Sequence, residues 1–322
     1  MTVQSRAKML ALSLVVLVAF LLPVRSAWSF GGDEAAKKDK PRTYDEMADA
    51  KADIAAALVK AKNNNKRVLL MFGANWCGWC HKLHGVFESN REIGKTLLYE
   101  YERVNIDIGK MDKNMDLVRK YGARADKEGV PYLTVLDADG KAIANQETGA
   151  LEEGDHHDPA KVKAFLDKWK AEPRDARRVF ERALSQAGKQ HKKVFLSFGA
   201  PWCGWCRRLE KFLAREEIAQ VMGKDFVSLK IDVDRMTGAD EIVKRFNPSE
   251  GGGLPWIVLV DAKGGSLITS FGPKGNVGYP VEPFEIAHFI DMLKKTKTHM
   301  TDDDIRKVEQ TLQKVAEDLR QG

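Results

Sequence analysis

Two short apolar runs, far apart in the chain, have the length and composition of buried strands. They extend from Val68 to Phe72 and from Val194 to Phe198, each with a basic residue before it and a glycine after it. Apolar runs of about four to eight residues between such boundaries are typical of strands covered on both faces. A second predicted strand follows each run and ends at Asp107 or at Asp232.

A third strand is predicted behind a proline in both halves of the chain. The apolar stretches "PYLTVL" and "PWIVLV" begin at Pro131 and Pro255. Each stretch is closed by a turn signal, Asp139-Gly140 in the first half and Lys263-Gly264 in the second. The pattern therefore predicts the same three strands twice.

Residues with a spacing of three or four predict helices between and around these strands. Thr43 and Glu46 have the spacing of a capping box, which predicts a helix start there. The apolar face of that helix would contain Met47, Ala50, Ile54, Leu58 and Ala61. Further helices are predicted in "PAKVKAFLDKWK", "PFEIAHFIDMLKK" and "TDDDIRKVEQTLQKVAEDL". In the last of these, Thr301 is the expected N-cap. The expected apolar face packs on the preceding domain and consists of Ile305, Val308, Leu312, Val315 and Leu319.

The two series of elements are copies of one domain. The offset is 126 residues from Cys77 to Cys203, 125 from Val104 to Leu229 and 124 from Val130 to Leu254. Three landmarks at nearly constant spacing indicate a tandem repeat. We predict a first repeat at residues 43–171, a second repeat at residues 172–296, and a C-terminal amphipathic helix within residues 297–322.

The amino-terminal segment has the pattern of a secretory signal peptide. A basic start is followed by 16 apolar residues, "MLALSLVVLVAFLLPV", and by the small residues Ala27 and Ser29. We predict a signal peptide at residues 1–29, cut after Ser29, and a flexible charged leader at residues 30–42. An uncleaved anchor is the alternative, but a spanning helix needs about 20 apolar residues. The protein is then periplasmic or secreted, and meets the membrane only transiently.

The charge pattern gives little support to a nucleic-acid partner. The formal net charge is +6, and Arg6, Lys8 and Arg25 of the amino-terminal segment contribute half of it. Lysine and glutamate are mixed along the rest, without an arginine-rich block. We expect no binding of nucleic acid.

All four cysteines of the chain lie in two copies of "WCGWC". Each copy lies where the pattern changes from strand to helix, so the first sulfur, of Cys77 or Cys203, meets the free N–H groups and the positive end of a helix. These two are predicted nucleophiles. Cys80 and Cys206 lie one turn further along and are predicted to resolve a mixed disulfide. The redox disulfides would be Cys77–Cys80 and Cys203–Cys206.

Two other uses of the cysteines, a zinc site and a structural disulfide, have less support. A zinc site of four thiolates would have to join equivalent places in two separate domains, and a disulfide that closes a two-residue loop is a weak structural staple. The adjacent histidines His156 and His157 are read as part of a solvated polar loop and not as a metal site. We therefore predict redox chemistry without a metal or an organic cofactor.

Each repeat resembles a thioredoxin-fold domain, over residues 43 to 295, and the end of the second repeat resembles bacterial periplasmic thioredoxin-like proteins. The resemblance implies an α/β fold with a mixed central β-sheet flanked by helices. It also implies cis-prolines at Pro131 and Pro255 that help to hold an extended client segment. The implied substrate-binding residues are Trp76, Trp79, Val130, Pro131, Trp202, Trp205, Leu254 and Pro255.

The chain departs from the thioredoxin pattern at one buried position. Thioredoxins have an acidic residue six positions before the first cysteine, and here those positions hold Met71 and Ser197. His84 and Glu210, four residues after the resolving cysteines, are candidates for a proton relay. Ordinary surface residues of a helix are the alternative interpretation for both.

The sequence thus predicts an exported thiol-disulfide oxidoreductase, either a protein disulfide reductase or an isomerase. Its partners would be client proteins with thiols or disulfides and a redox partner protein. The alternative is a chaperone or assembly-type binding module with the same fold, in which redox chemistry is incidental.

Overall fold

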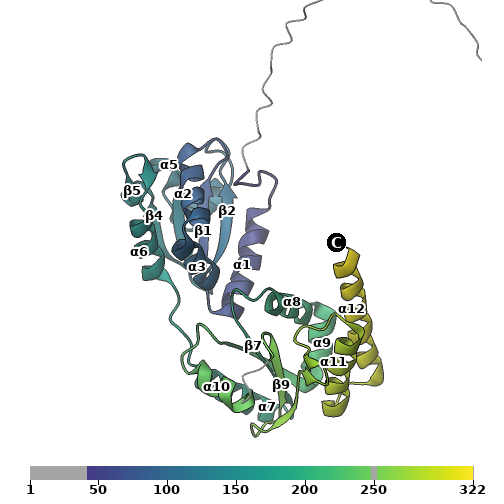
Figure 1. Ribbon diagram of the computed structural model, residues 1–322. Coiled ribbons are helices and arrows are strands. Elements are labelled where there is room, and N and C mark those ends of the chain that lie inside the picture. The colour runs from purple at the N-terminus through teal and green to yellow at the C-terminus, as the bar shows by residue number, and fades with distance from the viewer. Residues whose placement is uncertain (1–41, 248–251, 322) are drawn as a thin grey trace, which may run out of the picture. The chain divides into compact units, whose positions relative to one another are not determined.

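The computed structural model describes residues 42–247 and 252–321, and these described residues belong to one compact unit. The expected signal peptide, its cut after Ser29 and nearly all of the expected leader lie outside the described residues. Figure 1 shows the order of the helices and strands.

A four-stranded sheet forms the centre of the first repeat, in the order β2-β1-β3-β4. Its strands are β1 (Arg67–Gly73), β2 (Tyr101–Asp107), β3 (Tyr132–Leu136) and β4 (Ala142–Glu147). β1 is parallel to β2 and antiparallel to β3, so the sheet is mixed. The three strands predicted here are confirmed.

The second repeat contains a sheet of the same design, in the order β10-β9-β7-β8. Its strands are β7 (Lys193–Gly199), β8 (Phe226–Asp232), β9 (Trp256–Val260) and β10 (Ser266–Thr269). β7 is parallel to β8 and antiparallel to β9. The repeated topology is what the constant offsets between landmarks predict.

Helices cover both faces of the first sheet. They are α1 (Ala50–Asn64), α2 (Gly78–Ser89), α3 (Arg91–Glu100), α4 (Met115–Lys120), α5 (Ala125–Glu128) and α6 (Pro159–Trp169), with the hairpin β5 (Glu152–Glu153) and β6 (His156–His157) before α6. Side chains alternate along β1, so Leu70 and Phe72 pack with α1, while Leu69 and Met71 pack with α2, α3 and α6. One strand therefore supplies both hydrophobic clusters.

The second sheet is covered in the same way. Its helices are α7 (Ala176–Lys189), α8 (Gly204–Leu213), α9 (Glu216–Asp225), α10 (Ala239–Phe246), α11 (Pro283–Thr296) and α12 (Asp302–Gln321), and the hairpin β11 (Phe271–Gly272) and β12 (Gly275–Asn276) precedes α11. Leu196 and Phe198 pack with α7 and α10, whereas Phe195 packs with α8, α9 and α11. This mixed sheet between helices confirms the predicted α/β fold class.

The first helix starts later than the capping-box pattern predicts. α1 begins at Ala50, and Asp49 is its N-cap, with a side chain that accepts from two backbone N–H groups. Met47, expected on the apolar face, is 91% exposed. The prediction was wrong because Asp49 caps the helix in place of Thr43, while Thr43 and Tyr44 bond to His81 and Asn75 of the first cysteine site.

The C-terminal helix packs on the second repeat, as predicted. Ile305, Val308 and Leu312 of α12 are buried in the same cluster as α9 and α11. Thr301 accepts the N–H of Asp304 and thus caps the helix start. Leu319, expected on the same face, is 38% exposed because the helix continues past the cluster.

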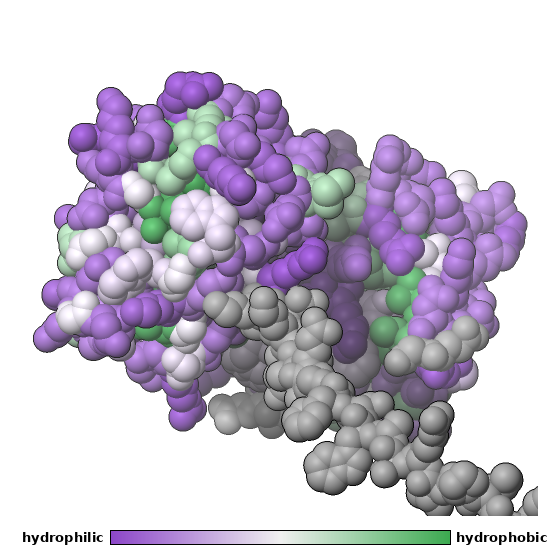
Figure 2. All heavy atoms as spheres, turned by 90° about the horizontal axis from the view of Figure 1, so that it is seen from above, coloured by the Kyte–Doolittle hydropathy of each residue, from purple (hydrophilic) through white to green (hydrophobic). Residues whose placement is uncertain are grey.

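The face of the molecule in Figure 2 is mainly hydrophilic, with small apolar areas between charged side chains. Within residues 42–247 and 252–321, no helix is both long and apolar enough to span a membrane.

Candidate active sites

Each cysteine pair lies at the junction of a central strand and the helix that follows it. β1 leads into α2, whose N-cap is Cys77, and β7 leads into α8, whose N-cap is Cys203. Disulfides join Cys77 to Cys80 and Cys203 to Cys206. In both pairs the sulfur of the first cysteine accepts the backbone N–H of the second, at 3.0 Å. A thiolate at the first cysteine would meet the same donor and the positive end of the helix.

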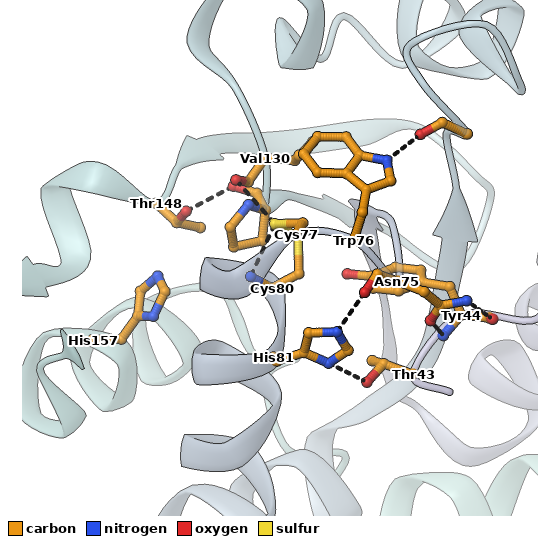
Figure 3. Close-up of a disulfide and its surroundings, with 12 residues drawn as sticks. Thr43, Tyr44, Asn75, Trp76, Cys77, Cys80, His81, Val130, Thr148 and His157 are labelled. Carbon is orange, nitrogen blue, oxygen red and sulfur yellow. Dashed lines mark hydrogen bonds between the residues drawn. A yellow bond between two sulfur atoms is a disulfide. The ribbon is translucent and has the colours of Figure 1, made fainter. Parts of the chain in front are cut away.

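The two proline loops lie against the cysteines. The peptide bonds Val130–Pro131 and Leu254–Pro255 are cis, as the thioredoxin resemblance implies. Cys77 Sγ lies 3.5 Å from the carbonyl oxygen of Val130, and Thr148 Oγ1 donates a hydrogen bond of 2.7 Å to the carbonyl oxygen of Pro131 (Figure 3). Leu254 packs with Cys203 and Cys206.

The tryptophan before each pair is fixed along one edge and open to solvent. Trp76 is 59% exposed, and its indole N–H donates to the carbonyl oxygen of Gly109. Trp202 is 57% exposed, and its indole N–H donates to Asp234. These hydrogen bonds orient two apolar rings beside the disulfides while leaving their faces accessible.

The tryptophans between the cysteines have different surroundings. Trp79 is half-buried, between the ammonium group of Lys82, 4.2 Å from the ring centroid, and the edge of His157. Trp205 is exposed, with Arg208 4.5 Å from its centroid and Tyr279 stacked on it. The two sites therefore present different surfaces to a client.

His157 is not part of a solvated loop, which corrects the sequence interpretation. It belongs to β6, is fully buried, and contacts the ring of Trp79 edge-on at 5.3 Å. Neither ring nitrogen has a hydrogen-bond partner among the described residues. Burial lowers the pKa of His157 to about 4, so the ring is neutral at physiological pH. Its neighbour His156 is exposed, as expected.

The candidate relay residue of the first site points to another partner. His84 is partly exposed on α2, and its Nε2 lies 3.8 Å from a carboxylate oxygen of Glu88. Burial, and then the nearby Arg103, outweigh Glu88 and lower the pKa of His84. Among the described residues, His84 forms no hydrogen bond or ion pair with Cys80.

The candidate relay residue of the second site lies in an ion pair beside the resolving cysteine. Glu210 Oε1 is 2.5 Å from Lys230 Nζ. Lys230 lies opposite Ser197 in the sheet, and both its Cε and Cys206 Sγ lie within 3.5 Å of the position that a Cβ on Gly199 would take. The ion pair of Glu210 and Lys230 thus lies near Cys206, although β7 has Ser197 and not an acidic residue at the position in question.

The structure also shows a group near Cys80 that sequence reasoning missed. Tyr44 is fully buried, and its hydroxyl and Cys80 Sγ both crowd the position that a Cβ on Gly73 would take. No sequence pattern indicates this contact, because Tyr44 lies in a segment that the pattern assigns to a helix.

A hollow of about 410 Å³ opens beside the proline loop of the second repeat. Its apolar lining consists of Phe198, Val233, Val243, Leu254 and Trp256. It is large enough for an apolar side chain of an extended segment held at that loop. Within the described parts of the chain, no group of three or more potential metal-binding side chains comes together.

The fold and the paired cysteines together define a thioredoxin-fold protein with two disulfide sites. The family model described as "Thioredoxin-like" matches residues 49–138. The Thioredox_DsbH model, described as "Protein of unknown function, DUF255", matches residues 159–320, which is half of the chain. The chain belongs to this thioredoxin-like family.

Named relatives include two fungal disulfide isomerases. Protein disulfide-isomerase tigA of Aspergillus niger is 27% identical over 259 residues, which cover 74% of this chain and 61% of that protein. Protein disulfide-isomerase erp38 of Neurospora crassa is 28% identical over 178 residues, 54% of this chain and 46% of that protein. The chain spans less than two thirds of the length of either relative. Their names support membership of the thiol-disulfide oxidoreductase family.

Solved structures similar to this chain include the disulphide isomerase from Xylella fastidiosa Temecula1. It is 32% identical with a TM-score of 0.36, and the match covers 39% of this chain and 95% of that one.

Proposed function

We propose that this protein is an exported enzyme that exchanges thiols and disulfides with client proteins at two Cys-Gly-Trp-Cys sites. The observation that carries the proposal is the position of both disulfides. Each one starts a helix, lies against a cis-proline loop and has an exposed tryptophan beside it. This arrangement combines a reactive sulfur with a surface for an extended client segment.

In the reducing direction, the thiolate of Cys77 or Cys203 attacks a client disulfide and forms a mixed disulfide. One client sulfur leaves as a thiolate and takes up a proton. The thiolate of Cys80 or Cys206 then attacks the first cysteine, and the second client sulfur leaves in the same way. The enzyme ends with its own disulfide and the client with two thiols. The oxidising direction is the reverse, and neither direction needs a metal or an organic cofactor.

The helix start makes the first cysteine of each pair the better nucleophile. The backbone N–H of the second cysteine already points at its sulfur, and the helix dipole adds positive potential there. Both effects favour a thiolate, which is the reactive form of cysteine. The second cysteine lies one helical turn further along, where its sulfur can attack the mixed disulfide of the first.

The reduction potential of each site tests the proposal. Two variants, Cys77→Ser with Cys80→Ser and Cys203→Ser with Cys206→Ser, each keep one active pair. They are equilibrated in thiol-disulfide buffers, with tryptophan fluorescence as the readout. A potential near about −270 mV would make that site a reductant, and one of roughly −120 to −180 mV an oxidant or isomerase. If neither pair equilibrates, or if neither variant exchanges disulfides with a model client, the proposal fails.

The proposal extends to compartment and partners. The signal-peptide pattern of residues 1–29 supports export to the periplasm or beyond the cell, where disulfides persist. A site that turns over must be returned to its starting state, so a redox partner protein is part of the proposal. The redox partner protein would bind at the same face of this protein as the clients.

A binding module is the second candidate, and the hollow beside Leu254 favours it. Together with the exposed rings of Trp202 and Trp205, this hollow offers an apolar landing surface that does not depend on the cysteines. With all four cysteines changed to serine, a chaperone would still suppress aggregation of an unfolded client. An exchange enzyme would lose its activity in the same variant.

A further inference from the structure

The resolving sulfur of the first site lies in a space that a glycine leaves open. β1 ends at Gly73, and a Cβ at this position would overlap with the Tyr44 hydroxyl and with Cys80 Sγ. The Tyr44 hydroxyl and the sulfur therefore share one small volume against the strand. Figure 3 shows Tyr44 and Cys80 in the same close-up, around the disulfide.

Tyr44 is held there by its backbone. Its N–H donates to Asn75 Oδ1 at 3.0 Å, and its carbonyl oxygen accepts from Asn75 Nδ2 at 2.9 Å. Asn75 is two residues before Cys77, so these bonds tie the segment to the cysteine loop. The neighbouring Thr43 contacts His81 of α2 at 3.2 Å. The position of the phenol is therefore fixed relative to the site.

The hydroxyl of Tyr44 is buried and has no hydrogen-bond partner among the described residues. Buried hydroxyl groups nearly always have a partner, because burying one without a hydrogen bond is unfavourable. In the oxidised site the sulfur of Cys80, which shares this space, is part of a disulfide and accepts only weakly. After reduction the same sulfur is a thiol or a thiolate, and a thiolate is a strong acceptor.

We propose that Tyr44 is a positioning residue that donates a hydrogen bond from its hydroxyl to Cys80 Sγ when the first site is reduced. This inference rests on the proposed exchange function and names a group that serves its resolving step. Cys80 attacks Cys77 as a thiolate, after its proton has gone to solvent. The bond between Cys77 and the client sulfur breaks, and the departing thiolate takes up a proton. The phenol stabilises the attacking thiolate and keeps its own proton throughout.

The charges around Tyr44 fit a donor and not a base. Burial, and then the carboxylate of Asp107, raise the pKa of Tyr44, so the phenol stays protonated. The other charged or titratable groups near it are Lys113, which is 3.3 Å from Asp107, Glu46, which is bonded to Asn75, and His81 on α2. Of these groups, the Tyr44 hydroxyl shares the space at Gly73 with Cys80 Sγ.

The second repeat fills the equivalent space differently. Beside Gly199, the neighbour of Cys206 Sγ is the side chain of Lys230, which is paired with Glu210. A neutral donor therefore faces one resolving sulfur and a charged pair faces the other. The effect of Tyr44 is thus specific to the first site, and the second site provides a control within the same chain.

The decisive measurement is the pKa of Cys80 with and without the phenol hydroxyl. In the full chain with Cys77, Cys203 and Cys206 changed to serine, Cys80 is the remaining cysteine. Its thiolate is titrated by ultraviolet absorbance and by the rate of alkylation at each pH. Tyr44→Phe keeps the ring and removes the hydroxyl. A hydrogen bond to a charged group has a strength that corresponds to about one pKa unit or more, so the pKa of Cys80 should rise by about one unit.

Tyr101→Phe is the matched control. Tyr101 is buried in the same hydrophobic cluster, but its hydroxyl donates to the carbonyl oxygen of Leu166. This variant should leave the pKa of Cys80 unchanged. If both variants raise that pKa equally, the effect is one of general packing and the proposal is overturned. An unchanged pKa in Tyr44→Phe overturns it as well.

A kinetic measurement and a second substitution complete the test. In the chain with only the first pair active, Tyr44→Phe should slow resolution of a Cys77 mixed disulfide about threefold below the pKa of Cys80, because a tenfold loss of thiolate is partly offset by the higher reactivity of the remaining thiolate. Above that pKa the slowing should disappear and the order of the two rates should reverse. If Tyr44→Phe does not fold, fluorinated tyrosine at position 44, a stronger donor, should lower the pKa of Cys80, and an unchanged or higher value contradicts the proposal. If Tyr44→Phe shifts the pKa of Cys80 but the protein exchanges no disulfide with a client, the hydrogen bond from Tyr44 stands and the proposed exchange function is rejected.

Discussion

The glycines that end β1 and β7 determine how closely each resolving sulfur can approach its strand. At Gly73 an added Cβ would overlap with a buried phenol and with Cys80 Sγ. At Gly199 the corresponding contacts are 3.2 Å to Cys206 Sγ and 3.5 Å to the flexible side chain of Lys230. The same substitution therefore tests two different degrees of crowding.

We expect Gly73→Ala to destabilise the first repeat by about 1–3 kcal/mol, because overpacking forces buried groups apart. Gly199→Ala should have a smaller effect, below about 1 kcal/mol, since small shifts relieve its contacts. Native-state hydrogen exchange of amides in β1 and β7 reports the two repeats separately. Equal losses in both strands would contradict the crowding argument.

The buried imidazole of His157 makes the first repeat sensitive to acid. Its pKa is about 4 in the folded chain, below the ordinary value of 6.5, because burial disfavours the charged ring. Between these pH values the unfolded chain binds a proton that the folded chain does not bind. The free energy of unfolding must therefore decrease as the pH falls from about 7 to 4, by about 3 kcal/mol at most.

Replacing His157 by Phe should remove that part of the pH dependence. Denaturant unfolding at a series of pH values measures it, and His156→Phe, at the exposed neighbouring position, is the matched control. The control should keep the full slope. If His157→Phe keeps it too, the imidazole is not the group that titrates.

At the scale of elements, one carboxylate connects α9 to the start of α12. Asp225 is almost fully buried and accepts the backbone N–H groups of Thr298, His299 and Met300. Burial alone would raise its pKa, but these donors outweigh it and hold the pKa below the ordinary value. This turn directs the chain so that Ile305 can enter the cluster of the second repeat.

We expect Asp225→Ala to cost about 3 kcal/mol, because it leaves several buried donors without an acceptor. The loss should be concentrated in α12, which can be followed by hydrogen exchange of its amides. Asp303→Ala, at an exposed position on the same helix, should change stability by no more than about 0.5 kcal/mol. Protection of α12 that survives in Asp225→Ala would show that apolar packing alone holds the helix.

At the scale of the whole molecule, the proposed export depends on cleavage of the amino-terminal segment. The signal-peptide pattern predicts that the mature chain begins at Phe30 after cleavage behind Ser29. N-terminal sequencing of the protein from a native host checks this, with the intact mass as a second readout. A chain that keeps residues 1–29 and stays with the membrane fraction would favour the anchor alternative.

The sequence by itself determined the repeated α/β architecture. Short apolar runs bounded by turn residues favour buried strands, and the nearly constant offsets between them indicate the duplication. The cysteine spacing, with its place at the change from strand to helix, determined which sulfurs lie together, because a local motif carries its own geometry. Thr301 and the apolar face behind it likewise placed α12.

Only the tertiary structure decided what surrounds the resolving sulfurs. Tyr44, which lies 36 residues before Cys80, reaches it from a distant segment, and Lys230 reaches Cys206 from a neighbouring strand, so no local pattern contains either contact. The same holds for His157, whose polar sequence context predicted exposure although Trp79 covers it. Burial and proximity between distant segments are properties of packing, and packing is settled only when all elements are in place.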